Sequence, residues 1–226
     1  MRYDSIIEGK FLSRPNRFIA YVEINGKKET VHVKNTGRCK ELLISGARVL
    51  LESSSNPERK TKYDLVSVFK GNTLINMDSQ APNKVALEYI KRIYPEAKIK
   101  PEYTYGNSRF DIYVETEREK ILIEVKGVTL ENEMIAMFPD APTERGVKHI
   151  NELIKAKSDG YECIVFFVIQ MKGIREFKPN YKTHKEFGVA LENAEKSGVK
   201  ILAFDSIVTE NTLKIDAPVS INLSED

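Results

Sequence analysis

Three charged residues in one short region could cleave a phosphodiester bond with the help of a metal ion. Asp111 follows Arg-Phe, and Glu124 and Lys126 interrupt the apolar run ILIEVKGV. Two carboxylates and a backbone carbonyl, here that of Val125, offer the hard oxygen ligands that suit Mg²⁺ or Mn²⁺. A lysine beside them could orient an attacking water or stabilise charge on the phosphoryl oxygens. These residues therefore predict a metal-dependent phosphodiesterase site with Mg²⁺ or Mn²⁺ as its cofactor.

The spacing of the three residues places two of them side by side. Side chains alternate between the faces of a β-strand, so Glu124 and Lys126 project from the same face. If the strand that contains Asp111 pairs with this one as a hairpin, Asp111 can approach the same spot. Unpaired charges in an otherwise apolar strand are costly to bury without a partner or ligand. A salt bridge between Glu124 and Lys126, or a solvated strand face, is the alternative interpretation.

The elements that must position these residues follow residue 80. We expect a helix over NKVALEYIKRIYP and then three strands, IKPEYTY, RFDIYVE and KILIEVKGV. A helix that starts near Pro142, the buried strand ECIVFFVIQ, the helix HKEFGVALENAEKSG and the strand KILAFDSIV follow. The order α-β-β-β-α-β-α-β predicts an α/β domain with a mixed central sheet over residues 81–226.

Residues 1–80 have a different pattern, which predicts a small all-β domain. Asn25-Gly26 lies between FIAYVEI and KETVHVK, which is a strong hairpin signal. ARVLLES, YDLVSVF and TLINMD are further short strands, and KELLI is a candidate for one small helix. Five short strands with tight turns predict an OB-like β-barrel, a fold that often binds nucleic acids. The turn-rich segment DSQAPN, residues 78–83, marks the expected domain boundary.

Composition and charge narrow the class of protein. Hydrophobic residues make up 41% and charged residues 30% of the 226 residues, which is typical of a globular protein. No apolar run approaches the ~20 residues of a membrane-spanning helix, and MRYDSIIEGK lacks the apolar core of a signal peptide. Cys39 and Cys163 indicate neither a disulfide framework nor a zinc site. We expect a cytoplasmic protein that does not bind a membrane.

The net charge of +2 is unevenly distributed along the chain. Residues 1–80 hold 14 Lys and Arg against 9 Asp and Glu, whereas residues 81–226 hold 21 against 24. A basic first part would suit attraction to a phosphate backbone, and an acidic second part would suit cation binding. Chance variation between segments is the alternative explanation of this difference.

Several longer stretches resemble known families. The Asp111…Glu124-Val125-Lys126 spacing is similar to that of the PD-(D/E)xK nuclease superfamily, with Phe110 where its proline would be. The chain as a whole resembles the sugar fermentation stimulation protein A family. The matching stretches are RPNRF (14–18), HVKNTGR (32–38), INMDSQAPN (75–83), SRFD (108–111), IEVKGVTL (123–130), MFPDAPTERGVKH (137–149) and FKPN (177–180). The resemblance implies DNA binding, a link to the regulation of sugar metabolism, notably of maltose, and an OB-like domain before a nuclease-like one.

The resemblance also assigns roles by position. Asp111 and Glu124 become metal ligands, and Lys126 becomes the catalytic lysine. The superfamily often adds an acidic residue from the first helix, where Glu88 stands, although Glu88 fits an ordinary surface position as well. Further candidates for the site are Arg145 and His149, which are four apart on one helix face, and Gln170 at the end of a buried strand. Surface or packing positions are the alternative for these residues.

Basic residues among the first 80 predict contacts with a nucleic-acid backbone. The candidates are Arg14, Arg17, His32, Lys34, Arg38, Lys60 and Lys62, although each is individually an ordinary surface residue. We therefore expect a DNA-binding protein, mostly nonspecific for sequence, with a metal-dependent nuclease site. A non-catalytic DNA-binding regulator of sugar metabolism is the alternative, so enzymatic activity stays open. RNA and sugars also stay open as ligands, and the residues leave the oligomeric state unspecified.

Overall fold

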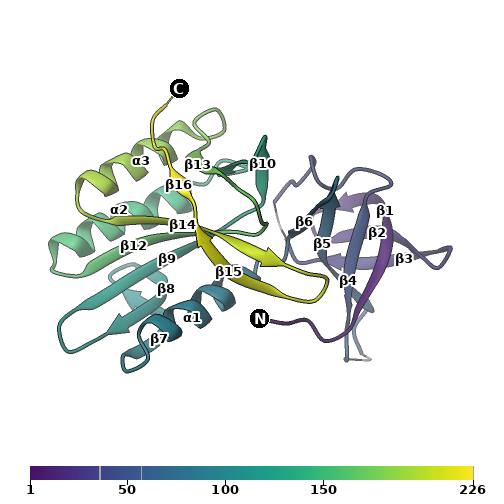
Figure 1. The fold of residues 1–226 in the computed structure, drawn as a ribbon, viewed down its shortest axis with the longest axis horizontal. Helices are drawn as coiled ribbons and strands as arrows, with labels where there is room; N and C mark the ends of the chain where they lie inside the picture. The colour runs from purple at the N-terminus through teal and green to yellow at the C-terminus, as the bar shows by residue number, and fades with distance from the viewer. Residues whose placement is uncertain (36, 57, 226) are drawn as a thin grey trace.

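The computed structural model describes residues 1–35, 37–56 and 58–225, in which a β-barrel lies beside an α/β part (Figure 1). Residue 36 of the HVKNTGR stretch lies outside the described residues. The barrel contains β1 (Ile6–Asn16), β2 (Ile19–Ile24), β3 (Lys27–Val33), β4 (Arg48–Ser53), β5 (Tyr63–Lys70) and β6 (Thr73–Asn76). The α/β part contains α1 (Ala81–Ile93), β7 (Lys98–Tyr105), β8 (Ser108–Glu115), β9 (Lys120–Val128), β10 (Leu130–Asn132), β11 (Ile135–Phe138), α2 (Glu144–Ser158), β12 (Glu162–Ile169), β13 (Glu176–Pro179), α3 (Lys185–Lys196), β14 (Lys200–Val208), β15 (Leu213–Pro218) and β16 (Ser220–Ile221).

The barrel is closed, which confirms the OB-like barrel that the sequence predicts. Its strands pair in the order β3-β2-β1-β4-β5-β6. In addition, β3 pairs with β5 in parallel, and this pairing joins the ends of a ring formed by β1 to β5. Asn25 and Gly26 have φ values of 50° and 76°, the left-handed conformation that a tight hairpin turn between β2 and β3 requires.

Two features of the barrel differ from the sequence prediction. The pattern does not reveal β1, because Gly9 and Pro15 interrupt it. Packing requires this glycine, since a Cβ atom on Gly9 would lie only 2.5 Å from Cγ1 of Val22 on β2. The KELLI segment forms turns in place of the predicted helix, with the amide of Leu43 donating to the carbonyl of Cys39 at 2.9 Å. So short a segment cannot offset the cost of helix nucleation.

The α/β part is built on a mixed sheet with the strand order β15-β14-β12-β9-β8-β7. The strands β9, β12 and β14 are mutually parallel, whereas β7, β8 and β15 run antiparallel to their neighbours. On one face Val85 of α1 shares a core with Ile123 of β9. On the other face Leu153 of α2 and Leu191 of α3 share a core with Leu122. The predicted mixed sheet and the order of its main elements are confirmed.

A second, smaller sheet has the strand order β10-β11-β13-β16, and the sequence analysis does not predict it. Its strands contain two to four residues each, which is too short for a recognisable alternation of polar and apolar positions. It continues the chain from the end of β9 and leads through β11 into the loop before α2. Within the described residues, none of the helices combines the length and the apolar character needed to cross a bilayer.

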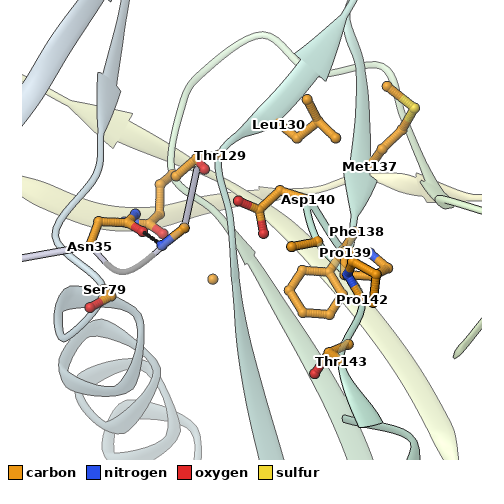
Figure 2. Close-up of a pocket in the computed structure, with 14 residues that line it drawn as sticks. Asn35, Ser79, Thr129, Leu130, Met137, Phe138, Pro139, Asp140, Pro142 and Thr143 are labelled. Carbon is orange, nitrogen blue, oxygen red and sulfur yellow. Dashed lines mark hydrogen bonds between the residues drawn. The ribbon is translucent and has the colours of Figure 1, made fainter. Parts of the chain in front are cut away.

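A cavity of about 310 Å³ lies where the barrel meets the α/β part (Figure 2). Asn35 and Ser79 border it from the barrel side. Phe138 and Asp140 border it from the segment that leads into α2, and Gln170 lines it from the end of β12. The cavity is therefore assembled from segments that are far apart in the sequence.

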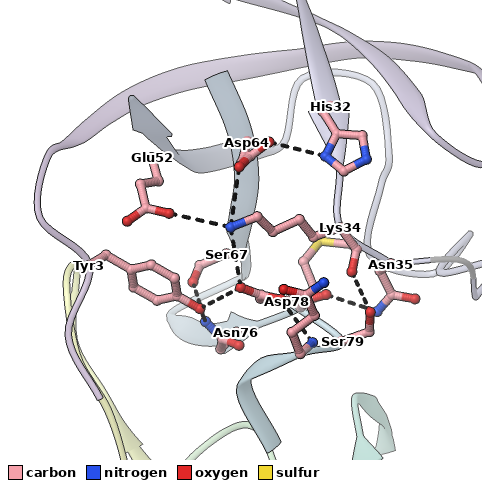
Figure 3. Close-up of polar contacts among 12 residues, drawn as sticks. Tyr3, His32, Lys34, Asn35, Glu52, Asp64, Ser67, Asn76, Asp78 and Ser79 are labelled. Carbon is pink, nitrogen blue, oxygen red and sulfur yellow. Dashed lines mark hydrogen bonds and ion pairs between the residues drawn. The ribbon is translucent and has the colours of Figure 1, made fainter. Parts of the chain in front are cut away.

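Buried polar side chains join the two parts next to this cavity. Gln170 donates through Nε2 to Oδ1 of Asn76 at 2.9 Å and to the carbonyl of Asp78 at 3.1 Å. Inside the barrel, Nζ of Lys34 lies 3.2 Å from Asp64 and 3.7 Å from Asp78 (Figure 3). This continuous set of contacts from β12 into the barrel fixes how the two parts meet.

Asp64 is the charged centre of the barrel closure. It lies on β5 opposite His32 of β3 and is 4% exposed. Arg59 binds its two oxygens at 2.6 and 3.0 Å, and Nδ1 of His32 lies 3.0 Å from Oδ1. Burial alone would raise the pKa of Asp64. The Arg59 guanidinium and the Lys34 ammonium outweigh burial and lower this pKa to about 2.

We predict that Asp64→Asn lowers the free energy of unfolding by about 2 kcal/mol near neutral pH. Because the folded pKa of about 2 lies below the ordinary value of 3.8, this stabilisation is complete above the ordinary pKa and is lost as the pH falls toward the folded pKa. Denaturant unfolding between neutral pH and pH ~2 measures it. Asp4→Asn, at an exposed position, is the matched control. Equal acid sensitivity of Asp64→Asn and the unmodified protein would contradict the assignment.

Candidate active site

The site forms where β8 and β9 stop pairing. Their antiparallel register ends at Ile112 opposite Ile123. One residue before Ile112 on β8, Oδ2 of Asp111 accepts a hydrogen bond from the backbone amide of Val125 at 2.7 Å. Phe110 packs edge-on against the ring of His149 from α2. The Asp111 carboxylate therefore occupies the gap that opens between the two strands.

The start of α1 contributes Asn83 to the same place. Its side-chain amide donates to Oδ1 of Asp111 at 2.7 Å, so both oxygens of this carboxylate have a donor. Glu88, the acidic residue expected from this helix, lies elsewhere: its carboxylate accepts a bond from the amino group of Met1 at 2.7 Å. Five residues of α-helix rotate a side chain by about 140° relative to the first one, which separates Glu88 from the face that Asn83 presents.

Glu124 is the buried centre of the site and is only 2% exposed. Its Oε1 lies 2.5 Å from Nζ of Lys126 and 2.5 Å from Nδ1 of His149. His149 can reach it because Glu124 faces α2, whose first turn is capped by the Thr143 side chain. Nε of Arg145 donates to Nε2 of His149 at 3.4 Å, so the ring carries its proton on Nδ1 and donates it to Glu124.

The two carboxyl groups influence each other electrostatically. Burial raises the pKa of Asp111 above its ordinary value, and the negative charge of Glu124 raises it further. Burial would also raise the pKa of Glu124, but the hydrogen bond from His149 and the ammonium of Lys126 outweigh it and lower this pKa. The site therefore holds an ionised Glu124 beside a second acid whose negative charge is poorly compensated.

The donor set fits a hard divalent cation. Oε2 of Glu124 is buried and has no hydrogen-bond partner among the described residues. A charged oxygen in that state is costly unless a cation or a donor meets it. Proteins usually bind Mg²⁺ through one or two carboxylates, and water molecules complete the coordination shell. The described residues contain no group of three or more His, Cys, Asp and Glu arranged around one metal position, so backbone oxygens or water would have to complete the shell.

Some of the other predicted site residues contact Glu124 or Asp111, and others only lie near them. Arg145 and His149 belong to it through their contacts with each other and with Glu124. Val125 contributes its backbone amide to Asp111. Gln170 is bonded to the barrel, yet it borders the strand of the site: a Cβ atom on Gly127 would lie 2.6 Å from its Oε1. Sequence reasoning missed Asn83, because an amide near a helix start has no distinctive pattern.

The predicted nucleic-acid contacts of the barrel divide into two groups. Arg14 is engaged internally, since its guanidinium donates to the carbonyls of Arg17 and Asn35 at 2.7 and 2.5 Å. His32 and Lys34 are bound to the acids of the barrel closure. These three side chains therefore form contacts within the barrel, and the Lys34 ammonium is paired with acids there.

The second group remains available for a ligand. Arg17, Arg38, Lys60 and Lys62 are exposed, and none of them forms a side-chain ion pair with a described residue. Arg17 and Arg38 line one groove together with Lys40, which the sequence analysis did not single out. Phe18, beside Arg17, is 53% exposed. The groove therefore presents cations to solvent, and an exposed aromatic ring follows Arg17 in the chain.

Two family models match the chain. The model described as the SfsA N-terminal OB domain matches residues 12–77. The model described as the sugar fermentation stimulation protein RE domain matches residues 80–212. Together these two matches include the barrel strands from β2 onward and every residue of the site described above.

Full-length relatives and a solved structure are also similar. A sugar fermentation stimulation protein homolog of Desulfitobacterium hafniense (strain Y51) is 59% identical over 227 residues, which cover 100% of both chains. A homolog of Clostridium beijerinckii is 56% identical and covers 99% of this chain and 100% of its own. The structure of Pyrococcus furiosus SfsA in complex with Ca²⁺ is 29% identical, with a TM-score of 0.88 and 98% of each chain covered.

We predict that His149→Ala lowers the free energy of unfolding by about 3 kcal/mol, because it removes a donor from the buried Glu124 charge. In a Glu124→Gln background, His149→Ala should lower the free energy of unfolding clearly less, because position 124 then carries no buried charge that needs a donor. Denaturant unfolding of the four proteins measures this coupling. Lys148→Ala, at the exposed neighbouring position, should change stability little. An equal cost of His149→Ala in both backgrounds would contradict the pairing.

Proposed function

This chain belongs to the sugar fermentation stimulation protein family, and on that basis we propose that it is a DNA-binding protein with a metal-dependent phosphodiesterase site. The proposed site consists of Asp111, Glu124 and Lys126, with Mg²⁺ or Mn²⁺ as the cofactor. The barrel would contribute contacts to the phosphate backbone, so binding would be mostly independent of sequence.

The observation that carries the proposal is the buried Oε2 of Glu124, which has no hydrogen-bond partner among the described residues, in a site where the Glu124 charge also raises the pKa of Asp111. A divalent cation would compensate both charges at once, which no neutral donor could do. The Ca²⁺ complex of the Pyrococcus furiosus relative supports a hard cation as the ligand of this family. Ca²⁺, Mg²⁺ and Mn²⁺ share a preference for oxygen ligands.

Each residue has a definite task in the proposed reaction. Bound Mg²⁺ or Mn²⁺ would polarise the phosphate and lower the pKa of a coordinated water. Asp111 and Glu124 would hold the cation, while His149 and Asn83 keep these carboxylates in place. Lys126, whose side chain is 15% exposed, can turn from Glu124 toward the attacking water or a phosphoryl oxygen. In the proposed hydrolysis the water oxygen would bond to phosphorus and lose a proton to solvent, while the bond to the leaving oxygen would break and that oxygen would take up a proton.

The groove that contains Arg17, Arg38 and Lys40 supports the DNA-binding part of the proposal. Its cations are exposed, and they lie on the barrel, in the part of the chain with an excess of Lys and Arg. Contacts of this kind release counterions, so affinity should fall steeply as salt rises.

One observation favours a second candidate, a non-catalytic DNA-binding regulator of sugar metabolism. Oε1 of Glu124 is already bonded to Lys126 and His149, and both oxygens of Asp111 accept hydrogen bonds. Such a cluster could serve only to hold the strands and α2 together. The two candidates differ in whether a metal is needed and in whether DNA is cut.

We predict that the protein cleaves plasmid or linear DNA in Mg²⁺ or Mn²⁺ and that EDTA stops the cleavage. Lys126→Ala and Asp111→Asn should each reduce the rate about 100-fold or more, because each removes a charge that acts on the metal or the phosphate. Gel analysis of the products measures the rate. Lys120→Ala, at the exposed start of the same strand, should retain full activity.

Two outcomes would count against the catalytic proposal. Cleavage that persists unchanged in Lys126→Ala would point to a contaminating nuclease. DNA binding that survives EDTA, with no cleavage in any metal, would favour the non-catalytic regulator.

A further inference from the structure

The cavity between the barrel and the α/β part has the size and the lining of a small-ligand site. Its volume of about 310 Å³ lies at the lower end of the range for such pockets, roughly 300–1,000 Å³. One side is apolar, with Phe138, Pro139 and Pro142 (Figure 2). The opposite side is polar and includes Asn35 and Ser79. A flat molecule with one hydrogen-bonding edge suits such a lining.

Asp140 gives the cavity a definite polarity. Its carboxylate points into the hollow between Thr129 and Phe138 (Figure 2). Across the part of the chain that the structure describes, no side chain or backbone amide donates a hydrogen bond to it. Gly37 leaves room for it, because a Cβ atom there would lie 2.6 Å from Oδ2 of Asp140. An unpaired carboxylate repels phosphate and accepts from a ligand that presents N–H groups.

The position of the cavity connects it to the proposed function. It shares Gly37 and Ala141 with the groove that contains Arg17, Arg38 and Lys40. On the other side it is lined by Gly127, the residue after Lys126. A nucleic-acid strand whose phosphates lie on the basic groove and continue toward Lys126 would therefore pass the mouth of the cavity.

We propose that this cavity binds one unpaired guanine base of a DNA strand. The inference rests on the proposed DNA binding but not on cleavage. Guanine presents two adjacent donors on its Watson–Crick edge, N1–H and the 2-amino group, and these match the two oxygens of the Asp140 carboxylate. The Phe138 ring lies on the cavity wall, where the face of a base can pack against it.

The other bases fit the carboxylate less well. Adenine and cytosine each present a single amino group beside a ring nitrogen that is itself an acceptor and would face the second oxygen. Thymine presents one N–H between two carbonyl oxygens, which the carboxylate repels. Asp140 thus favours guanine because guanine alone presents two adjacent donors. A bidentate contact of this kind strengthens binding of the matching base about fivefold or more relative to the other bases.

The test uses short oligothymidylates that carry one central dG, dI or dT, with fluorescence anisotropy in EDTA as the readout. The base of dI lacks only the 2-amino group of guanine. We expect the dG oligonucleotide to bind at least about fivefold more tightly than the dI and dT versions. In Asp140→Asn this ratio should fall to about one. Glu133→Gln, which removes an equal charge at an exposed turn, should keep the ratio.

The loss of any negative charge strengthens binding to a polyanion and so changes the affinity for all three oligonucleotides. The readout is therefore the ratio of the affinity for dG to the affinities for dI and dT. Gly37→Ala is a second variant, because its added Cβ would displace the Asp140 carboxylate. It should also lose the preference for the dG oligonucleotide. Thermal unfolding checks that both variants fold. Equal binding of dG, dI and dT, or a dG preference that survives in both variants, would overturn the inference. Failure to bind any oligonucleotide would overturn it together with the proposed DNA binding. A dG preference in a protein that never cleaves DNA would support it and reject only the catalytic proposal.

Discussion

A buried carboxylate on a central strand is the constraint around which the α/β part is arranged. Glu124 lies in an apolar strand, and its charge must be balanced where water cannot reach it. Lys126 and His149 balance one oxygen, which ties β9 to α2. The second oxygen is buried without a hydrogen-bond partner among the described residues, and the charge of Glu124 raises the pKa of Asp111 nearby. The separation of β8 and β9 therefore creates a polar opening in an otherwise continuous hydrophobic sheet.

The barrel is held against this opening by a second set of buried polar contacts. Gln170, at the end of the strand next to β9, donates to Asn76 and to the carbonyl of Asp78. Lys34 continues these contacts to Asp64, at the point where the barrel closes. The basic groove and the cavity next to this junction share Gly37 and Ala141, and the cavity is also lined by Gly127, the residue after Lys126. The proposed guanine pocket follows from the same geometry.

Local patterns in the sequence predict much of this structure, but not the partners of individual side chains. Alternation along β9 correctly places Glu124 and Lys126 on one face, and the Asn-Gly signal correctly places a hairpin. Helix rotation decides that Asn83, and not Glu88, meets Asp111, and rotation depends on how α1 packs. Likewise, Lys34 is recognisably basic in sequence, but only the closed barrel surrounds it with acids. Charge type is visible in a sequence, whereas its compensation is a property of the fold.

The most direct test of the account is the position of bound metal in crystals soaked with Mn²⁺. Anomalous scattering should show one Mn²⁺ in contact with Oε2 of Glu124 and with the Asp111 carboxylate, at distances of roughly 2.0–2.3 Å. Crystals of Glu124→Gln treated in the same way should show no such peak. An empty site in the unmodified protein, or an identical peak in Glu124→Gln, would contradict the claim that this carboxylate pair is a metal site.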